Sequence, residues 1–233
     1  MVFYAYVKQS TDTWSYRYVM AFASHEVADE WWRAVSTSSV VSFANSIRRV
    51  NAQFYLHDVN QANAANSLVT AGVATEFLNK VIFLLMDDLG GRQLSVIPSP
   101  DHLVDHISGN SFFIRSKTSP YEYWYCPLLC DGTASNEVYV SRNERTRFRV
   151  DISNKGSAGI VMIGSDEIAI TLPTISLSIH ITDGGQVILS PAPQVGLKFS
   201  DLLNKFTVGP PSKSDPSLKE LFYTDNGEDW ELA

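Results

Sequence analysis

The chain has 233 residues, of which 45% are hydrophobic, 12% aromatic and 18% charged, and its formal net charge is −7. This apolar content excludes wholesale disorder, and the negative charge argues against a nucleic-acid partner, because phosphate binding needs an excess of Lys and Arg. The longest apolar run, residues 81–86, is much shorter than the roughly 20 residues of a membrane span. Length alone does not separate one domain from two.

The N-terminal sequence has neither a basic segment nor a long apolar segment, and the chain has no Asn-X-Ser/Thr acceptor for N-glycosylation. We therefore expect a cytoplasmic protein, with unconventional secretion as the alternative. The two cysteines, Cys126 and Cys130, are too few for a disulfide framework, and their spacing differs from the CxxC motif. Two buried free thiols are expected, and a local disulfide or a reactive thiol is the alternative.

Alternating apolar residues predict a β-hairpin over the first 22 residues, with Phe3, Ala5 and Val7 on one side. Ser24 is a candidate N-cap for a helix over residues 25–36, in which apolar residues recur every four positions. The start of the chain thus predicts the order strand, strand, helix.

Between residues 47 and 109 the hydrophobic periodicity is weaker. Pro98 and Pro100 interrupt this part of the chain and form a candidate hinge. The elements that we expect there are a strand at 47–57, a loop with a short helix at 71–78, a strand at 81–86, a strand at 94–97, and a helix at 101–108 closed by Gly109.

From Ser111 onward the sequence favours short strands at regular spacing, separated by turn residues. The predicted strands are 112–116, 121–126, 138–142, 147–152, 159–163, 167–171, 175–182 and 186–190. A short helix capped by Ser200 is expected at 201–206. Residues 209–233 are rich in acids and contain three prolines, and we expect a tail that is ordered only where its apolar residues contact the body.

These elements predict an α+β fold that is predominantly β. A hairpin-helix-sheet region at 1–98 precedes a β-rich region at 101–208, which is a β-sandwich or barrel-like structure, and the acidic tail follows at 209–233. One continuous domain is the alternative organisation. Residues 112–152 also have the rhythm of one β-trefoil unit, so a trefoil-like C-terminal part is a second option.

An arginine-rich segment at 142–149 is the sharpest local feature. Because side chains alternate along a strand, Arg145, Arg147 and Arg149 share one face, and Arg142 precedes them. Guanidiniums grouped in this way can bind a phosphate, sulfate or carboxylate bidentately. The alternatives are a solvent-exposed face whose arginines pair with nearby acids, and docking of the chain's own acidic tail.

A second feature is the tyrosine-rich segment 121–125. Alternation places Tyr121, Tyr123 and Tyr125 on one side and Trp124 on the other, and a row of aromatic rings is suited to stacking on sugar rings. A similar cluster near the N-terminus consists of Trp14, Tyr16 and Tyr18. For both clusters, packing of the rings in the core is the alternative.

Two histidines, His102 and His106, would lie one turn apart on the helix predicted at 101–108. This spacing allows two imidazoles to share a metal ion, and a polar connector between domains is the alternative. Since no common catalytic or phosphate-binding motif occurs in the sequence, we expect neither an enzyme nor a cofactor.

The leading functional hypothesis is a non-enzymatic, lectin-like protein that binds a glycan or another small polar ligand through its Tyr/Trp strands. The second hypothesis is an interaction module that binds acidic or phosphorylated partners through the arginine-rich strand. A metal-assisted enzyme is the third. A homo-oligomer is also open, because edge strands favour association.

Overall fold

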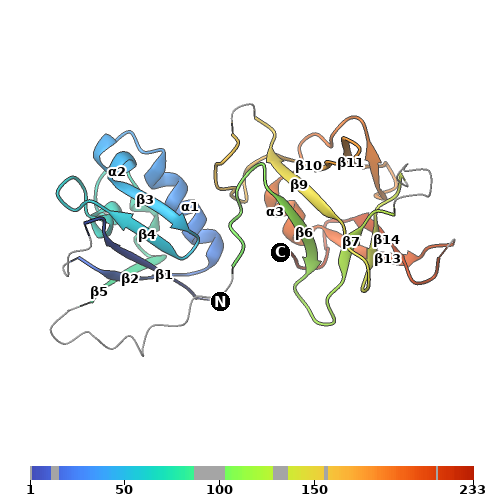
Figure 1. Ribbon diagram of the computed structural model, residues 1–233, viewed down its shortest axis with the longest axis horizontal. Coiled ribbons are helices and arrows are strands. Elements are labelled where there is room, and N and C mark those ends of the chain that lie inside the picture. Colours follow the sequence, from blue (N-terminus) through green and yellow to red (C-terminus); the bar gives the residue numbers. More distant parts are fainter. Residues whose placement is uncertain (1, 12–15, 87–102, 128–135, 155–156, 214) are drawn as a thin grey trace. The chain divides into compact units, whose positions relative to one another are not determined.

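The computed structural model describes residues 2–11, 16–86, 103–127, 136–154, 157–213 and 215–233 (Figure 1). They form two compact units, unit 1 at Met1–Asp105 and unit 2 at His106–Ala233. The fold is α+β and predominantly β, as the sequence predicts. The prolines at the predicted hinge lie outside the described residues. Within those residues, none of the helices is long and apolar enough to span a membrane.

Unit 1 is built on a five-stranded sheet in the order β3-β4-β1-β2-β5, in which β1 and β4 are parallel and the other neighbours antiparallel. Its elements in chain order are β1 (Phe3–Gln9), β2 (Tyr18–Phe22), α1 (His25–Ser36), α2 (Val41–Ser46), β3 (Ile47–Asn51), β4 (Phe54–His57), the 3₁₀ turns η1 (Ala64–Leu68) and η2 (Thr75–Phe77), and β5 (Val81–Leu85).

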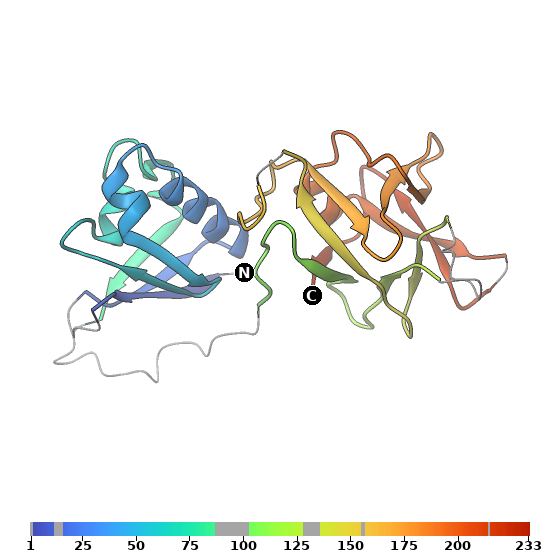
Figure 2. The ribbon, with the colours of Figure 1, turned by 45° about the horizontal axis from the view of Figure 1, so that its top comes forward.

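The first hairpin and α1 confirm the strongest local predictions. The Ser24 hydroxyl accepts a hydrogen bond from the Val27 backbone N–H, which caps the helix at its first turn. Trp31 is fully buried, and its indole N–H donates to the Ser67 hydroxyl at 3.0 Å. The hydrophobic side of α1 therefore packs on one face of the sheet, where Figure 2 shows the helix.

The strand predicted at 47–57 is two strands, β3 and β4, because the chain reverses between them. The side-chain oxygen of Asn51 accepts a hydrogen bond from the Gln53 backbone N–H at 2.9 Å, which is the hydrogen bond of an Asx turn. The helix predicted at 71–78 is reduced to the single turn η2, and α2 was not predicted.

Unit 2 contains a curled sheet with the strand order β12-β11-β10-β9-β6-β7-β8-β14-β13, and β15 pairs with β6. Its elements are β6 (Ser111–Ser116), β7 (Tyr123–Tyr125), β8 (Tyr139–Ser141), β9 (Arg147–Ile152), β10 (Ile168–Leu172), β11 (Leu177–Ile181), β12 (Val187–Ser190), α3 (Phe199–Asn204), β13 (Phe206–Pro211), β14 (Lys219–Tyr223) and β15 (Trp230–Leu232).

The core of unit 2 includes a group of perpendicular aromatic rings. Trp124 is fully buried, and its ring centroid lies 6.1, 4.8 and 5.9 Å from those of Phe148, Phe206 and Trp230. The Trp230 indole N–H donates to the Phe206 carbonyl at 2.8 Å. Because β14 and β15 come from residues 209–233, this segment is part of the sheet and the core, and not the separate tail that its acidic composition predicts.

The helix predicted at 101–108 is not present over its described part. Backbone groups of residues 106–108 bond instead to a second segment: Met162 N–H donates to the His106 carbonyl and Ser108 N–H to the Ile160 carbonyl. The strand predicted at 159–163 contributes only the bridge between Ile107 and Val161. The strand predicted at 94–97 lies outside the described residues.

Candidate ligand-binding face

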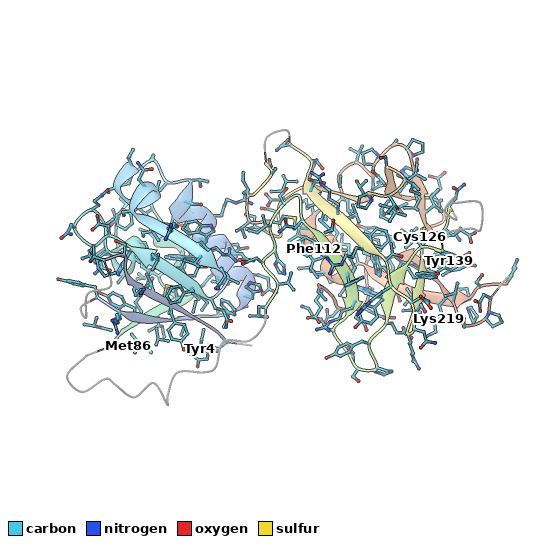
Figure 3. The ribbon with its side chains drawn as sticks, viewed as in Figure 1. Tyr4, Met86, Phe112, Cys126, Tyr139 and Lys219 are labelled. Carbon is cyan, nitrogen blue, oxygen red and sulfur yellow. The ribbon has the colours of Figure 1, made fainter. Side chains whose placement is uncertain are left out.

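Strands β6, β7 and β9 of unit 2 turn one side to the core and the other side outward. The inward residues are all buried: Phe112 (labelled in Figure 3), Ile114, Trp124, Phe148 and Val150. The outward residues are half-buried or exposed: Phe113, Arg115, Tyr123, Tyr125, Arg147 and Arg149. The tyrosine row and the arginine stripe, which the sequence presents as separate features, are therefore brought together on one face of the sheet.

Guanidiniums lie over aromatic rings on this face. The guanidinium carbon of Arg145 is 4.5 Å from the ring centroid of Phe113 and 5.7 Å from that of Tyr123. Arg147 lies 4.7 Å from the same Phe113 ring, and Arg115 lies 4.5 Å from the Tyr121 ring. These distances are within the range of cation–π attraction. We call these residues the Arg–aromatic face: Phe113, Arg115, Tyr121, Tyr123, Arg145 and Arg147.

Strand register explains why rings and guanidiniums meet. Phe113 of β6 lies directly opposite Arg147 of β9, and Arg115 of β6 lies directly opposite Tyr123 of β7. Directly opposed side chains in an antiparallel pair are about 5 Å apart at Cβ, close enough for a long cation to reach its neighbour's ring. The face is thus a product of pairing between strands far apart in the sequence.

Two outward-facing arginines, one on the Arg–aromatic face and one beside it, are paired with carboxylates. Arg115 donates to Glu231 of β15 at 2.6 Å, and this hydrogen bond is the main reason that the pKa of Arg115 is raised. Arg149 donates to Asp151 at 2.9 Å. These two cations are largely neutralised by the protein itself.

Arg142 is also paired, but away from the face. It donates to the buried Glu122 at 3.0 Å, and Lys219 (labelled in Figure 3) donates to the same carboxylate oxygen at 2.8 Å. By contrast, neither Arg145 nor Arg147 makes an ion pair with any carboxylate in the part of the chain that the structure describes. Of the four arginines that the sequence singles out, Arg145 and Arg147 are therefore the two that have no carboxylate partner among the described residues.

The aromatic candidates differ in their access to a ligand. Tyr121 is 43% exposed, and Tyr123 and Tyr125 are half-buried on the outward side. Burial, followed by the nearby carboxylate of Glu144, raises the pKa of Tyr125. Trp124 is 0% exposed, so its expected role as a surface contact is wrong: it belongs to the core because alternation turns it inward.

The N-terminal aromatic cluster does not form an exposed row over its described part. Tyr18 is buried, its hydroxyl accepts a hydrogen bond from Asn63 at 2.9 Å, and its ring packs against His57. Tyr16 is exposed, and Trp14 lies outside the described residues. Tyr18 is thus a core residue, and of the two described members of the cluster Tyr16 is the one that a ligand could contact.

The metal hypothesis required a helix that would align two histidines. His102 lies outside the described residues, and His106 lies in extended chain, so the i, i+4 geometry is absent. Cys126 (labelled in Figure 3) is buried, and burial raises the pKa of its thiol to about 11. Cys130 lies outside the described residues.

Sequence reasoning missed a buried charge cluster in unit 1. Asp29 of α1 is 2% exposed and pairs with Arg49 of β3 at 2.9 Å, and Arg49 also donates to Asp105 at 2.8 Å. The buried hydroxyl of Tyr55 lies near them, and burial is the main reason that its pKa is raised. Since single charged residues on α1 and β3 gave no local signal, only the tertiary structure reveals the pair.

Comparisons with protein-family models, with curated proteins and with solved structures found no match for this chain.

Proposed function

We propose that unit 2 is a non-enzymatic binding module that holds an anionic group of a partner protein on the Arg–aromatic face. The observation that carries the proposal is the placement of Arg145 and Arg147 over one ring, Phe113, without a compensating carboxylate among the described residues. Two adjacent cations without counter-charges attract anions, and the net charge of −7 makes such a site unusual on this chain.

The stacked arrangement suits anion binding. A guanidinium that lies over a ring uses its flat face in the contact, while its N–H groups remain in the plane, where they can donate to a carboxylate or phosphate. Stacking also restricts two otherwise flexible side chains, which reduces the conformational entropy lost when a ligand binds. The Phe113 ring therefore acts as a support for both donors.

The same contacts give less support to the sugar-binding hypothesis. A pyranose would stack on the flat faces of the tyrosines, but Arg115 lies over Tyr121 and Arg145 lies near Tyr123. Each guanidinium takes up part of a ring surface on which a sugar could otherwise stack. For this reason we propose an anionic protein segment as the ligand, and not a neutral glycan.

A cytoplasmic location is part of this proposal. Two cysteines are too few for the disulfide framework that is typical of small secreted domains.

The test is the binding of anionic peptides to the full chain. Degenerate peptide libraries with a fixed acidic or phosphorylated centre should retain the protein on a resin, and retention should fall as salt rises. The double variant Arg145→Ala/Arg147→Ala should weaken binding by about 100-fold, at roughly 1.5 kcal/mol for each lost charge-assisted hydrogen-bonding group. The matched control is Arg142→Ala, which removes an exposed arginine paired with Glu122 and leaves Lys219 on that carboxylate. Equal retention of the double variant and the control would refute the proposal.

A further inference from the structure

We infer that the outer side of the unit 1 sheet binds an amphipathic helix of another protein. The apolar side of that helix lies on the sheet, and carboxylates at one of its ends meet Lys8 and Arg48. This site is separate from the Arg–aromatic face, so the inference does not depend on the function proposed for unit 2. Two features carry it: exposed apolar side chains on the sheet, and the sign of the charges beside them.

One side of the unit 1 sheet is covered by α1, and the other side is not (Figure 2). The ring of Trp31 in α1 lies 5.6 Å from that of Phe22 and 5.9 Å from that of Phe83, so α1 covers the side on which these residues lie. Alternation along β5 turns Ile82 and Leu84 to the opposite side. They are 61% and 53% exposed, so the described part of unit 1 leaves them largely uncovered.

Strand register joins the outward apolar residues into two rows that cross the sheet. The first row takes one residue from each of four neighbouring strands, in the order Phe54, Tyr6, Val19 and Leu84. The second row consists of Tyr4 (labelled in Figure 3), Ala21 and Ile82. Val19 is 9% exposed, and the other residues are half-buried or exposed. We call the two rows together the outer apolar surface.

The outer apolar surface has the dimensions of one short helix. Four strands spaced by about 4.8 Å place the ends of the first row roughly 14 Å apart, and five residues of a strand extend over about the same distance. A helix with its side chains is about 10–12 Å wide, and three turns of it are about 16 Å long. A helix of this length would therefore cover both rows and form a second layer on this side of the sheet.

The charges beside the surface favour a partner that carries carboxylates. The next row across the strands contains Arg48, Leu56 and Lys8, so both of its charged groups are cations. None of the five strands contains Asp or Glu. A helix that ends in acidic residues supplies the complementary charge at this row.

The same charges disfavour two other occupants. In a two-fold dimer the surface would meet its own copy, which offers no carboxylate to Lys8 or Arg48. An anionic lipid surface is recognised by clusters of about four to eight cations, and the net charge of −7 opposes it. A foreign acidic helix is therefore the occupant that the surface fits.

The experiment measures the binding of two helical peptide libraries to the full chain. Both consist of peptides of about 18 residues with degenerate apolar residues at helical spacing, and they differ only in the last turn, which carries glutamates in one library and lysines in the other. We expect the glutamate library to bind about tenfold or more tightly. The variant Lys8→Glu/Arg48→Glu should reverse this preference, and it changes no apolar residue of the surface.

A second variant tests the apolar contact. Leu84→Asp places a charge where the helix would pack and should weaken binding of the glutamate library about tenfold or more. The matched control is Val69→Asp, which changes a 70% exposed apolar residue of unit 1 outside the strands and should leave binding unchanged.

Equal binding of the two libraries, or a preference that survives the charge reversal, overturns the inference. Dimerisation of the chain in light scattering that Leu84→Asp weakens would assign the surface to a second copy and overturn it as well. If neither library binds, the inference is also overturned; a thermal midpoint lowered by Leu84→Asp and not by Val69→Asp would then show that another segment of this chain covers the surface. None of these results changes the binding expected of Arg145 and Arg147.

Discussion

The ring of His57 in unit 1 provides a stability prediction that does not depend on any ligand. The imidazole is 0% exposed, with Nε2 2.8 Å from the Tyr16 carbonyl and Nδ1 3.1 Å from the Ala64 backbone nitrogen. Because a carbonyl can only accept and an amide can only donate, Nε2 must carry the proton and Nδ1 must accept. A second proton on Nδ1 would face the Ala64 N–H and remove that hydrogen bond.

The sign of the pH effect follows from the direction of the pKa shift. Burial lowers the pKa of His57 below its ordinary 6.5, against smaller opposing contributions from the Tyr16 hydrogen bond and from Asp58. The unfolded chain therefore takes up the proton at a higher pH than the folded chain does. Stability contributed by neutral His57 is fully present above pH 6.5 and is lost as the pH falls toward the folded-state pKa, by at most about 1.4 kcal/mol for each pH unit.

The assay is urea unfolding of the parent chain and of His57→Gln across about pH 8 to 5. Glutamine cannot be protonated, so the difference between the two free energies of unfolding isolates His57 from the other histidines, which titrate in both chains. The parent should lose up to about 1.4 kcal/mol more than the variant by pH 5.5, and its Ala64 amide should exchange faster with solvent. Parallel curves for the two chains would refute the tautomer and the direction of the shift.

Three further predictions concern the face, the buried ion pair and the thiol. Phe113→Leu removes the ring under two guanidiniums and should lower the free energy of unfolding by about 1–2 kcal/mol, at roughly 0.5–1 kcal/mol per exposed cation–π contact; a loss below about 0.5 kcal/mol would show that the stacking is energetically neutral. Asp29→Asn should cost about 2–3 kcal/mol in thermal or urea unfolding, because it leaves Arg49 buried with only one remaining carboxylate; an unchanged midpoint would contradict this. In a Cys130→Ser background, Cys126 with its pKa of about 11 should react with iodoacetamide at pH 8 about 100-fold more slowly in the native chain than in urea, and comparable rates would show that the thiol is accessible.

The sequence predicted a strand or helix correctly where the spacing of its apolar residues places them all on one side of the element, against a core. The alternation of β1 and the four-residue recurrence of Trp31 in α1 both place apolar groups against a core, and both predictions were confirmed. The prediction failed where hydrogen bonds from elsewhere took precedence. The turn at Asn51 divides the strand predicted at 47–57 into two strands. Backbone hydrogen bonds from residues 160–162 to residues 106–108 take the place of the helix predicted at 101–108.

The candidate face shows the same limit for function. Alternation correctly placed Tyr123 and Arg147 on the outward sides of their strands, and it placed Trp124 opposite the tyrosines. It could not reveal that Trp124 is sealed in the core or that Arg147 lies opposite Phe113, because strand register is a non-local property. For residues 209–233 we expected order where the apolar residues contact the body, and Trp230 is buried there; the composition did not reveal that the segment forms the strands β14 and β15.

The position of β15 has a consequence for the order in which the protein is made. Trp230 completes the aromatic core beneath Trp124, and its strand pairs with β6, which begins more than a hundred residues earlier. During translation, unit 1 has all of its strands once residue 105 has emerged from the ribosome, whereas unit 2 must wait for its last strand. Until Trp230 has emerged, Trp124 of nascent unit 2 lacks one of its aromatic neighbours, and a chaperone could bind the apolar surface that this leaves uncovered.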